Sequence, residues 1–193
     1  NVDHLFCSKS SSKLDFVRIA CHFHEVKQGV EIAKILKAKG YIVGFNLMHA
    51  GGRSSLDLQA SVELINSSNS VDVLYFADSF GSMKEAEVTR INDEFKKQWE
   101  GTLGIHTHNN MGRAIQNSLH AKSIGVEWLD CTITGMGRGA GNAESELLVS
   151  ELSVLEARYS AKPLLDLAIS YFNEMKRACG WGMSAPYYLG ATK

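Results

Sequence analysis

The sequence contains few of the residues that mark fibrous, disulfide-rich or membrane-spanning chains. Its 193 residues include 2 prolines and 4 cysteines, and no apolar run approaches the length of a membrane-spanning helix. Cys7, Cys21, Cys131 and Cys179 are widely spread and form no C-x-x-C pair, which is typical of reduced thiols and not of a disulfide framework. We therefore expect a cytoplasmic globular protein.

An excess of charge of either sign is also missing. The chain has 20 Lys and Arg against 21 Asp and Glu, with a formal net charge of −1. Without a basic run, neither nucleic acid nor an anionic membrane surface is a predicted partner. The composition, 45% hydrophobic and 21% charged, is ordinary for a globular domain of this length.

Five apolar segments alternate with amphipathic helical patterns. Strands are predicted at 15–21, 41–48, 71–79, 102–109 and 126–134, and helices at 25–40, 55–68, 84–99, 113–125 and 143–160. A further amphipathic helix is predicted from Pro163. Intervals of about 25–30 residues are the length of one βα unit in a parallel sheet.

Two architectures accommodate five such units. A five-stranded doubly wound sheet would be complete at this length, whereas a (β/α)8 barrel of roughly 250 residues would be represented by its last five units. Both place function at the carboxyl ends of the strands. Periodicity alone leaves the choice open.

The segment GIHTHNNMG, from Gly104 to Gly112, contains a histidine pair at a predicted strand end. Because residues two apart on a strand face the same way, His106 and His108 could bind one cation, provided that an oxygen ligand arrives from another strand. The alternative is that one histidine packs by hydrogen bonding and the other is a loop residue. The position at a functional rim favours the metal interpretation.

Other polar residues also follow predicted strands. In CHFH, we expect His22 to line the pocket and His24 to lie at the start of the following helix. Asn46, at the end of the second strand, is a further candidate for substrate contact. Asp78 either caps the turn after its strand or serves as a proton carrier.

The glycine-rich segment GMGRGAGNAESE runs from a strand to a helix. It matches a dinucleotide fingerprint, but no later strand carries the required acid, so nicotinamide binding is disfavoured. Gly137, Arg138 and Gly139 would instead bring main chain and charge close to an anionic substrate. Asn142 is either the N-cap of the following helix or an oxygen ligand for the cation.

These motifs together carry a resemblance. The segments VRIACHFHE, GFNLMHAGG, ADSFGSM, GIHTHNNMG, ITGMGRGAGN and WGMSAPYYLG occur in this order over most of the chain. The sequence resembles the metal-dependent pyruvate aldolase and lyase superfamily, also called HMGL-like or pyruvate carboxyltransferase domains, and looks closest to its 4-hydroxy-2-oxovalerate aldolase branch. The resemblance favours the (β/α)8 TIM barrel and implies that residues 1–160 are units 4–8 of it, with a C-terminal helical extension at 161–193.

The resemblance also implies an activity. His106 and His108 match the family's histidine ligands, Asn142 a further ligand, and Asp78 an acid near the substrate. The implied cofactor is Mn²⁺ or Mg²⁺. The implied reaction is that of a carbon–carbon lyase, which cleaves or forms a C–C bond next to a 2-oxo acid through a metal-stabilised enolate. The small-molecule partner would be a 2-oxo acid or its aldol adduct, and members of the family are usually homo-oligomers.

One family motif is missing. The RDG-type segment, which supplies an arginine and an aspartate ligand from the first strand, does not occur in this chain. Because the chain also starts with Asn1 and not Met, we expect a piece of a longer polypeptide that is inactive by itself. The alternatives are an acyl-CoA-dependent Claisen condensation, as in isopropylmalate synthase, and a non-catalytic truncated barrel that acts as an interaction module.

Overall fold

The computed structural model describes residues 2–192 and contains one parallel sheet of five strands. The strands are β1 (Phe16–Cys21), β2 (Ile42–Leu47), β3 (Val73–Asp78), β4 (Thr102–Thr107) and β5 (Trp128–Leu129). They lie in the order in which they occur along the chain, β1-β2-β3-β4-β5. Such sequential order is the order of a barrel, whereas a doubly wound sheet reverses direction at a switch point.

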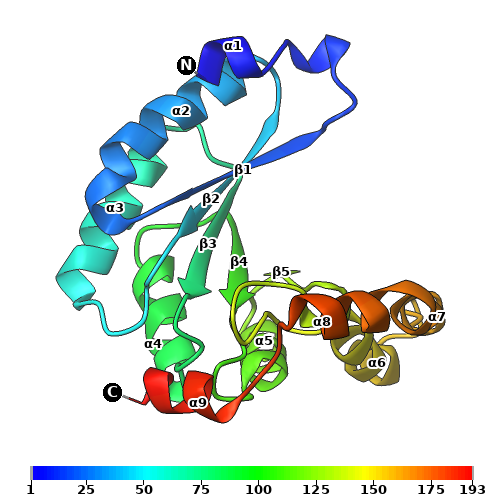
Figure 1. The fold of residues 1–193 in the computed structure, drawn as a ribbon. Coiled ribbons are helices and arrows are strands. Elements are labelled where there is room, and N and C mark those ends of the chain that lie inside the picture. Colours follow the sequence, from blue (N-terminus) through cyan, green and yellow to red (C-terminus); the bar gives the residue numbers. More distant parts are fainter. Residues whose placement is uncertain (1, 193) are drawn as a thin grey trace.

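A helix follows each strand. These helices are α2 (Val26–Ala38), α3 (Ser55–Ser67), α4 (Glu85–Lys96), α5 (Ala114–Ser123) and α6 (Ser145–Leu155). In α2 the predicted apolar stripe is buried, and Gly40 ends the helix with a φ of 91° that other residues rarely adopt. Figure 1 shows α2, α3 and α4 following one another along the outer side of the strands.

The two faces of the sheet differ in what covers them. Val43, Phe45, Leu74 and Phe76 point outward and join the helices in one buried apolar cluster. The alternate residues point to the inner side, where Gly104 leaves room for the ring of Tyr75; a Cβ there would lie 2.3 Å from ring atoms. A single layer of helices on one face is the arrangement of a barrel wall.

The sheet curls so strongly that its two end strands meet across the inner side. The rings of Phe16 on β1 and Trp128 on β5 stack with centroids 5.2 Å apart. Arg18 on β1 forms an ion pair with Asp130, the first residue after β5. The five units therefore form the curved part of a (β/α)8 barrel, as the resemblance implied, and the doubly wound alternative is wrong.

Two predicted elements differ in the structure. The strand predicted at 126–134 is paired only at Trp128–Leu129, because β5 has a neighbour, β4, on one side alone and the chain then turns into a 3₁₀ segment, Ile133–Gly135. The helix predicted from Pro163 is α7 (Lys162–Leu167), a π-helical stretch (Ala168–Phe172) and α8 (Asn173–Cys179). Gly180 ends it in the left-handed conformation.

A last helix, α9 (Ala185–Ala191), returns to the carboxyl-end side of the strands, below β3 and β4 in Figure 1. The chain begins with a short helix, α1 (Val2–Leu5), and two 3₁₀ turns at Lys9–Ser11 and Phe23–Glu25. The division at residues 160 and 161 stays a prediction. In the described part of the chain, no helix combines the length and the apolar character needed to cross a membrane.

Candidate metal centre

The two predicted histidine ligands lie together at the carboxyl end of β4. His106 is the last residue but one of the strand, and His108 follows its end. Their rings lie edge to face with centroids 5.1 Å apart. Because this separation is shorter than the rise of two strand residues, both rings lean toward one point on the same side of the sheet.

The glycine-rich segment is attached directly to this strand end. His108 and Asn142 form an isolated antiparallel bridge, and the main-chain N–H of Asn109 donates to the carbonyl of Gly141 over 2.9 Å. The main-chain N–H of His108 donates to the carbonyl of Asp78 over 3.3 Å. Three predicted site segments, far apart in the sequence, therefore meet at His108.

Asn142 is buried beside the histidine pair's strand and does not cap the following helix. The residue is 8% exposed, and its Nδ2 donates to the carbonyl of Met136 over 3.1 Å, which fixes the orientation of the carboxamide. Its Oδ1 is buried and has no hydrogen-bond partner within the described residues. Since α6 has Glu144 at its N-cap position, the capping alternative for Asn142 is wrong. An orphaned buried carbonyl oxygen is costly unless a ligand completes it.

Gly137 makes this orientation possible. A Cβ on Gly137 would lie 2.7 Å from Nδ2 of Asn142, so no larger residue leaves room for the carboxamide. Gly139 lies similarly close to the ring of Tyr187 on α9, which a Cβ would approach to 3.2 Å. Both glycines thus face protein atoms, and their predicted contact with substrate stays a prediction.

The electrostatics of the site keep His108 neutral. Burial is the main cause that lowers the pKa of His108 from 6.5 to about 4, and the neighbouring His106 and Arg138 lower it further. A neutral imidazole retains the lone pair that a metal ligand needs. The side chain of Arg138 is exposed, yet its charge also lowers the pKa of His49, as a smaller cause after burial, His22 and Arg53.

Asp78 is the last residue of β3, and its carboxylate is bonded within the turn that follows the strand. The residue is 2% exposed, and its carboxylate oxygens accept the main-chain N–H groups of Ser82 at 3.0 Å and Met83 at 3.2 Å. Burial raises its pKa to about 6, and these N–H groups oppose the rise. The contacts are those of a turn cap before α4. A role as proton carrier stays a prediction.

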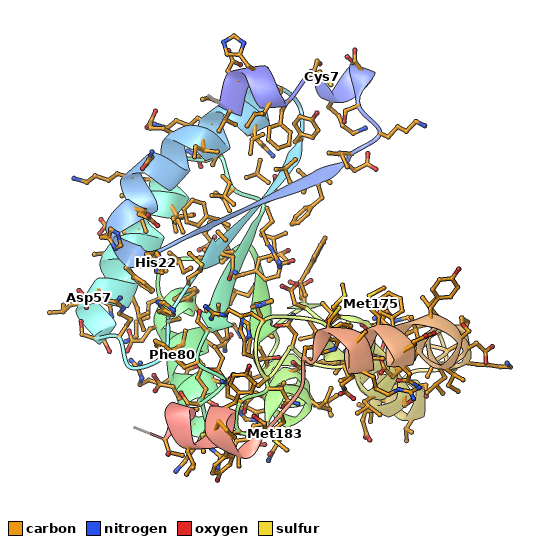
Figure 2. All side chains as sticks on the ribbon, in the orientation of Figure 1. Cys7, His22, Asp57, Phe80, Met175 and Met183 are labelled. Carbon is orange, nitrogen blue, oxygen red and sulfur yellow. The ribbon has the colours of Figure 1, made fainter. Side chains whose placement is uncertain are left out.

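Aromatic rings line the rim beside the histidine pair. The ring of His49 stacks on Phe80 with centroids 4.6 Å apart and lies 4.9 Å from the ring of His22. His22 and Phe80 follow the ends of β1 and β3, as Figure 2 shows. His49 has a φ of 57°, and its N–H donates to Oγ of Ser79 over 2.9 Å. His24 lies in the 3₁₀ turn that leads into α2, as expected.

Asn46 points from β2 to the inner side of the sheet. It is 5% exposed, and its Oδ1 also has no partner among the described residues. Two further residues on this inner side, Arg18 and Asp130, were not predicted from the sequence motifs. A charged residue at alternate spacing within the apolar run FVRIAC was the available indication for Arg18.

The residue types at this strand end suit a divalent cation whose remaining ligands would come from outside these residues. Within residues 2–192, no three His, Cys, Asp or Glu side chains converge in a way that could hold a metal ion. Two imidazoles do lie together, and the main chain of Asn142 is bridged to that of His108. Imidazole and amide oxygen are common ligand types for divalent ions. The fit rests on the unpartnered Oδ1 of Asn142.

Comparison with known proteins shows the family of the chain. The model of the HMGL-like family matches residues 4–169. The 4-hydroxy-2-oxovalerate aldolase of Pelotomaculum thermopropionicum is 37% identical over 137 residues, which cover 70% of this chain and 40% of the relative. The oxaloacetate decarboxylase of Mycobacterium tuberculosis is 30% identical over 149 residues, covering 72% and 41%.

Solved structures share the fold. The N-terminal domain of an aldolase-like protein from Bacteroides vulgatus superposes with a TM-score of 0.83 at 30% identity, covering 92% of this chain and 59% of that one. The HMG-CoA lyase of Brucella melitensis superposes with a TM-score of 0.71 at 14% identity, covering 80% and 65%.

The chain belongs to the HMGL-like family, whose model covers most of its length. Within that family it resembles the 4-hydroxy-2-oxovalerate aldolases, as the sequence predicted. The chain spans about two fifths of the length of these curated relatives.

Proposed function

We propose that the complete protein is a divalent-metal-dependent carbon–carbon lyase of the aldolase type, acting on a 2-oxo acid or its aldol adduct. The observation that carries the proposal is the buried, unpartnered Oδ1 of Asn142, bridged through its main chain to the second histidine of the pair. The names of the relatives, an aldolase and a decarboxylase of 2-oxo acids, support the same reaction class.

In this proposal, His106, His108 and Asn142 hold Mn²⁺ or Mg²⁺. The ion, when bound, would supply Lewis-acid polarisation of the keto oxygen next to the bond that breaks or forms. The protein's own part is to present neutral imidazole at His108, whose lowered pKa prevents protonation near pH 7 from competing with the ligand. Arg138, whose charge reaches His108 and His49, provides a cation for the substrate carboxylate.

The aromatic rim separates the site from bulk water on one side. The rings of His22, His49 and Phe80 form a row from the end of β1 to the loop after β3, in which His49 stacks on Phe80 and the His22 ring is tilted against His49. Such a wall confines a small molecule between the rim and the histidine pair, and Asn46 offers a free acceptor deeper on the inner side.

The full-length protein tests the proposal. Cleavage of a 4-hydroxy-2-oxo acid to pyruvate should cease after exhaustive chelation and return on addition of Mn²⁺ or Mg²⁺. Asn142→Ala in the full-length protein should weaken metal binding, whereas Ser184→Ala, before α9, should not. Unchanged turnover after chelation, or unchanged metal affinity in Asn142→Ala, would contradict the proposal.

A further inference from the structure

His106, the first histidine of the pair, meets two charged side chains on the inner side of the sheet, one from β1 and one from the residue after β5. Nδ1 of His106 on β4 lies 2.8 Å from Oδ2 of Asp130, after β5. The guanidinium of Arg18, on β1, contacts the same oxygen. The side chains of His106 and Asp130 are 20% and 21% exposed, so the contact is largely shielded from water.

The chemistry of a carboxylate fixes the direction of the hydrogen bond. An ionised carboxylate only accepts, so Nδ1 of His106 must carry the proton when this bond forms. In a neutral imidazole the other ring nitrogen, Nε2, then has the free lone pair. The two nitrogens lie on opposite sides of the ring, so Asp130 is behind His106 and is not itself a ligand beside it.

Arg18 in turn holds Asp130. Its guanidinium lies 4.9 Å from the centroid of the Tyr75 ring, which limits the rotamers available to the arginine. Arg18 and His106 both contact Oδ2 of Asp130, and together they restrain the carboxylate. The contact therefore forms a chain, Arg18–Asp130–His106, that ends at one of the proposed metal ligands.

We propose that Asp130 is a positioning residue, which holds the imidazole of His106 in the tautomer and orientation that present Nε2 to a divalent cation. The inference rests on the proposed function, because it assigns the ligand atom of that site. It assigns a role to Asp130, which lies outside all of the sequence motifs quoted above. Hydrogen-bonded partners behind a ligand of this kind change metal affinity about 10- to 100-fold when they are lost.

The test must separate the hydrogen bond from the loss of charge. Asp130→Ala alone would leave the Arg18 guanidinium without its partner and could prevent folding. The informative comparison is therefore Arg18→Met against the double variant Arg18→Met/Asp130→Ala. The double variant has the net charge of the unsubstituted chain, whereas Arg18→Met differs from both by one charge. Mn²⁺ affinity is therefore also compared between the double variant and the unsubstituted chain, a comparison that keeps the net charge constant.

Two measurements apply to each variant. Long-range ¹⁵N–¹H correlation spectra of the metal-free protein identify which nitrogen of His106 carries the proton, and calorimetric titration with Mn²⁺ gives the affinity. We expect the Nδ1–H tautomer in the unsubstituted chain and in Arg18→Met. In the double variant we expect the Nε2–H tautomer to become populated and Mn²⁺ to bind about 10- to 100-fold more weakly than to Arg18→Met.

The possible results are distinct. A double variant that keeps the Nδ1–H tautomer, or whose Mn²⁺ affinity lies within tenfold of Arg18→Met, would overturn the role of Asp130. An unsubstituted chain that binds no Mn²⁺ in either its present or its full-length form would instead overturn the metal centre. The tautomer spectra are recorded without metal, so they test the hydrogen bond between His106 and Asp130 whether or not the chain binds Mn²⁺.

Discussion

On acidification, protonation of Asp78 should stabilise the folded chain, whereas protonation of His108 should destabilise it. Replacing Asp78 should therefore reveal the destabilisation that comes from the histidine. Burial raises the pKa of Asp78 from 3.8 to about 6. The folded chain therefore binds this proton more tightly than the unfolded chain, and stability rises as the pH falls through this window. A shift of about two pKa units corresponds to about 3 kcal/mol in the free energy of unfolding.

Protonation of His108 has the opposite effect on the free energy of unfolding. Its pKa is lowered from 6.5 to about 4, so the unfolded chain binds the proton more tightly and stability is lost as the pH falls from 6.5 toward 4. The full shift would correspond to about 3 kcal/mol, and partial exposure of the ring reduces the expected loss to about 2 kcal/mol. In the unsubstituted chain the two responses largely cancel.

Asp78→Asn removes one of them. The carboxamide has nearly the shape of the carboxylate and can still accept one of the two N–H groups of Ser82 and Met83. Between pH 6.5 and 4, the free energy of unfolding of the variant should fall by about 2 kcal/mol, whereas that of the unsubstituted chain should stay level or rise by about 1 kcal/mol. Urea denaturation followed by circular dichroism, without metal, measures both.

The difference between the two pH profiles is the decisive quantity, because every other titrating group is common to both proteins. We expect it to be about 2–3 kcal/mol over this range. Parallel profiles for Asp78→Asn and the unsubstituted chain would show that burial does not raise the pKa of Asp78, and the reasoning would fail.

Three other substitutions probe the site and the sheet. His106→Ala should weaken Mn²⁺ binding by at least about tenfold and leave the melting temperature nearly unchanged, with the exposed His24→Ala as control; an unaltered calorimetric titration would contradict this. Gly137→Ala should also weaken Mn²⁺ binding, because its Cβ would lie 2.7 Å from Nδ2 of Asn142; equal affinity would show that the carboxamide is not needed. Gly104→Ala should destabilise the chain by about 1–3 kcal/mol, since its Cβ would lie 2.3 Å from the Tyr75 ring, whereas Gly190→Ala, with nothing within 4 Å, should not; equal urea midpoints would refute this.

Local patterns predicted most of the fold. The first four strands and three of the helices lie within about two residues of the predicted ranges, because apolar period and glycine stops are local properties of the chain. The helices predicted at 84–99 and 143–160 end earlier, at Lys96 and Leu155. β5 was predicted too long, because strand pairing depends on neighbours and this strand has only one. The choice of the barrel needed the family resemblance, since curvature is a property of the whole sheet.

The candidate site was predictable only in part. The spacing of His106 and His108 indicated their common side, but two interpretations of Asn142 remained until the first turn of α6 was seen to begin at Ser145. Nothing local indicates that Asp130 faces His106. That contact depends on the register between β4 and β5, in which Ile105 pairs with Leu129.

The meeting of the two end strands has a consequence for the time course of folding. Arg18 and Asp130 are 112 positions apart in the sequence, and the loop between them includes every intervening βα unit. Because the entropy lost on closing a loop grows with its length, this contact should form after the local units have packed. The indole of Trp128, stacked on Phe16 at 5.2 Å, lies where that last event occurs. During refolding, the fluorescence of Trp128 should therefore change later than the circular dichroism of the helices. During unfolding, the fluorescence should change earlier than the circular dichroism.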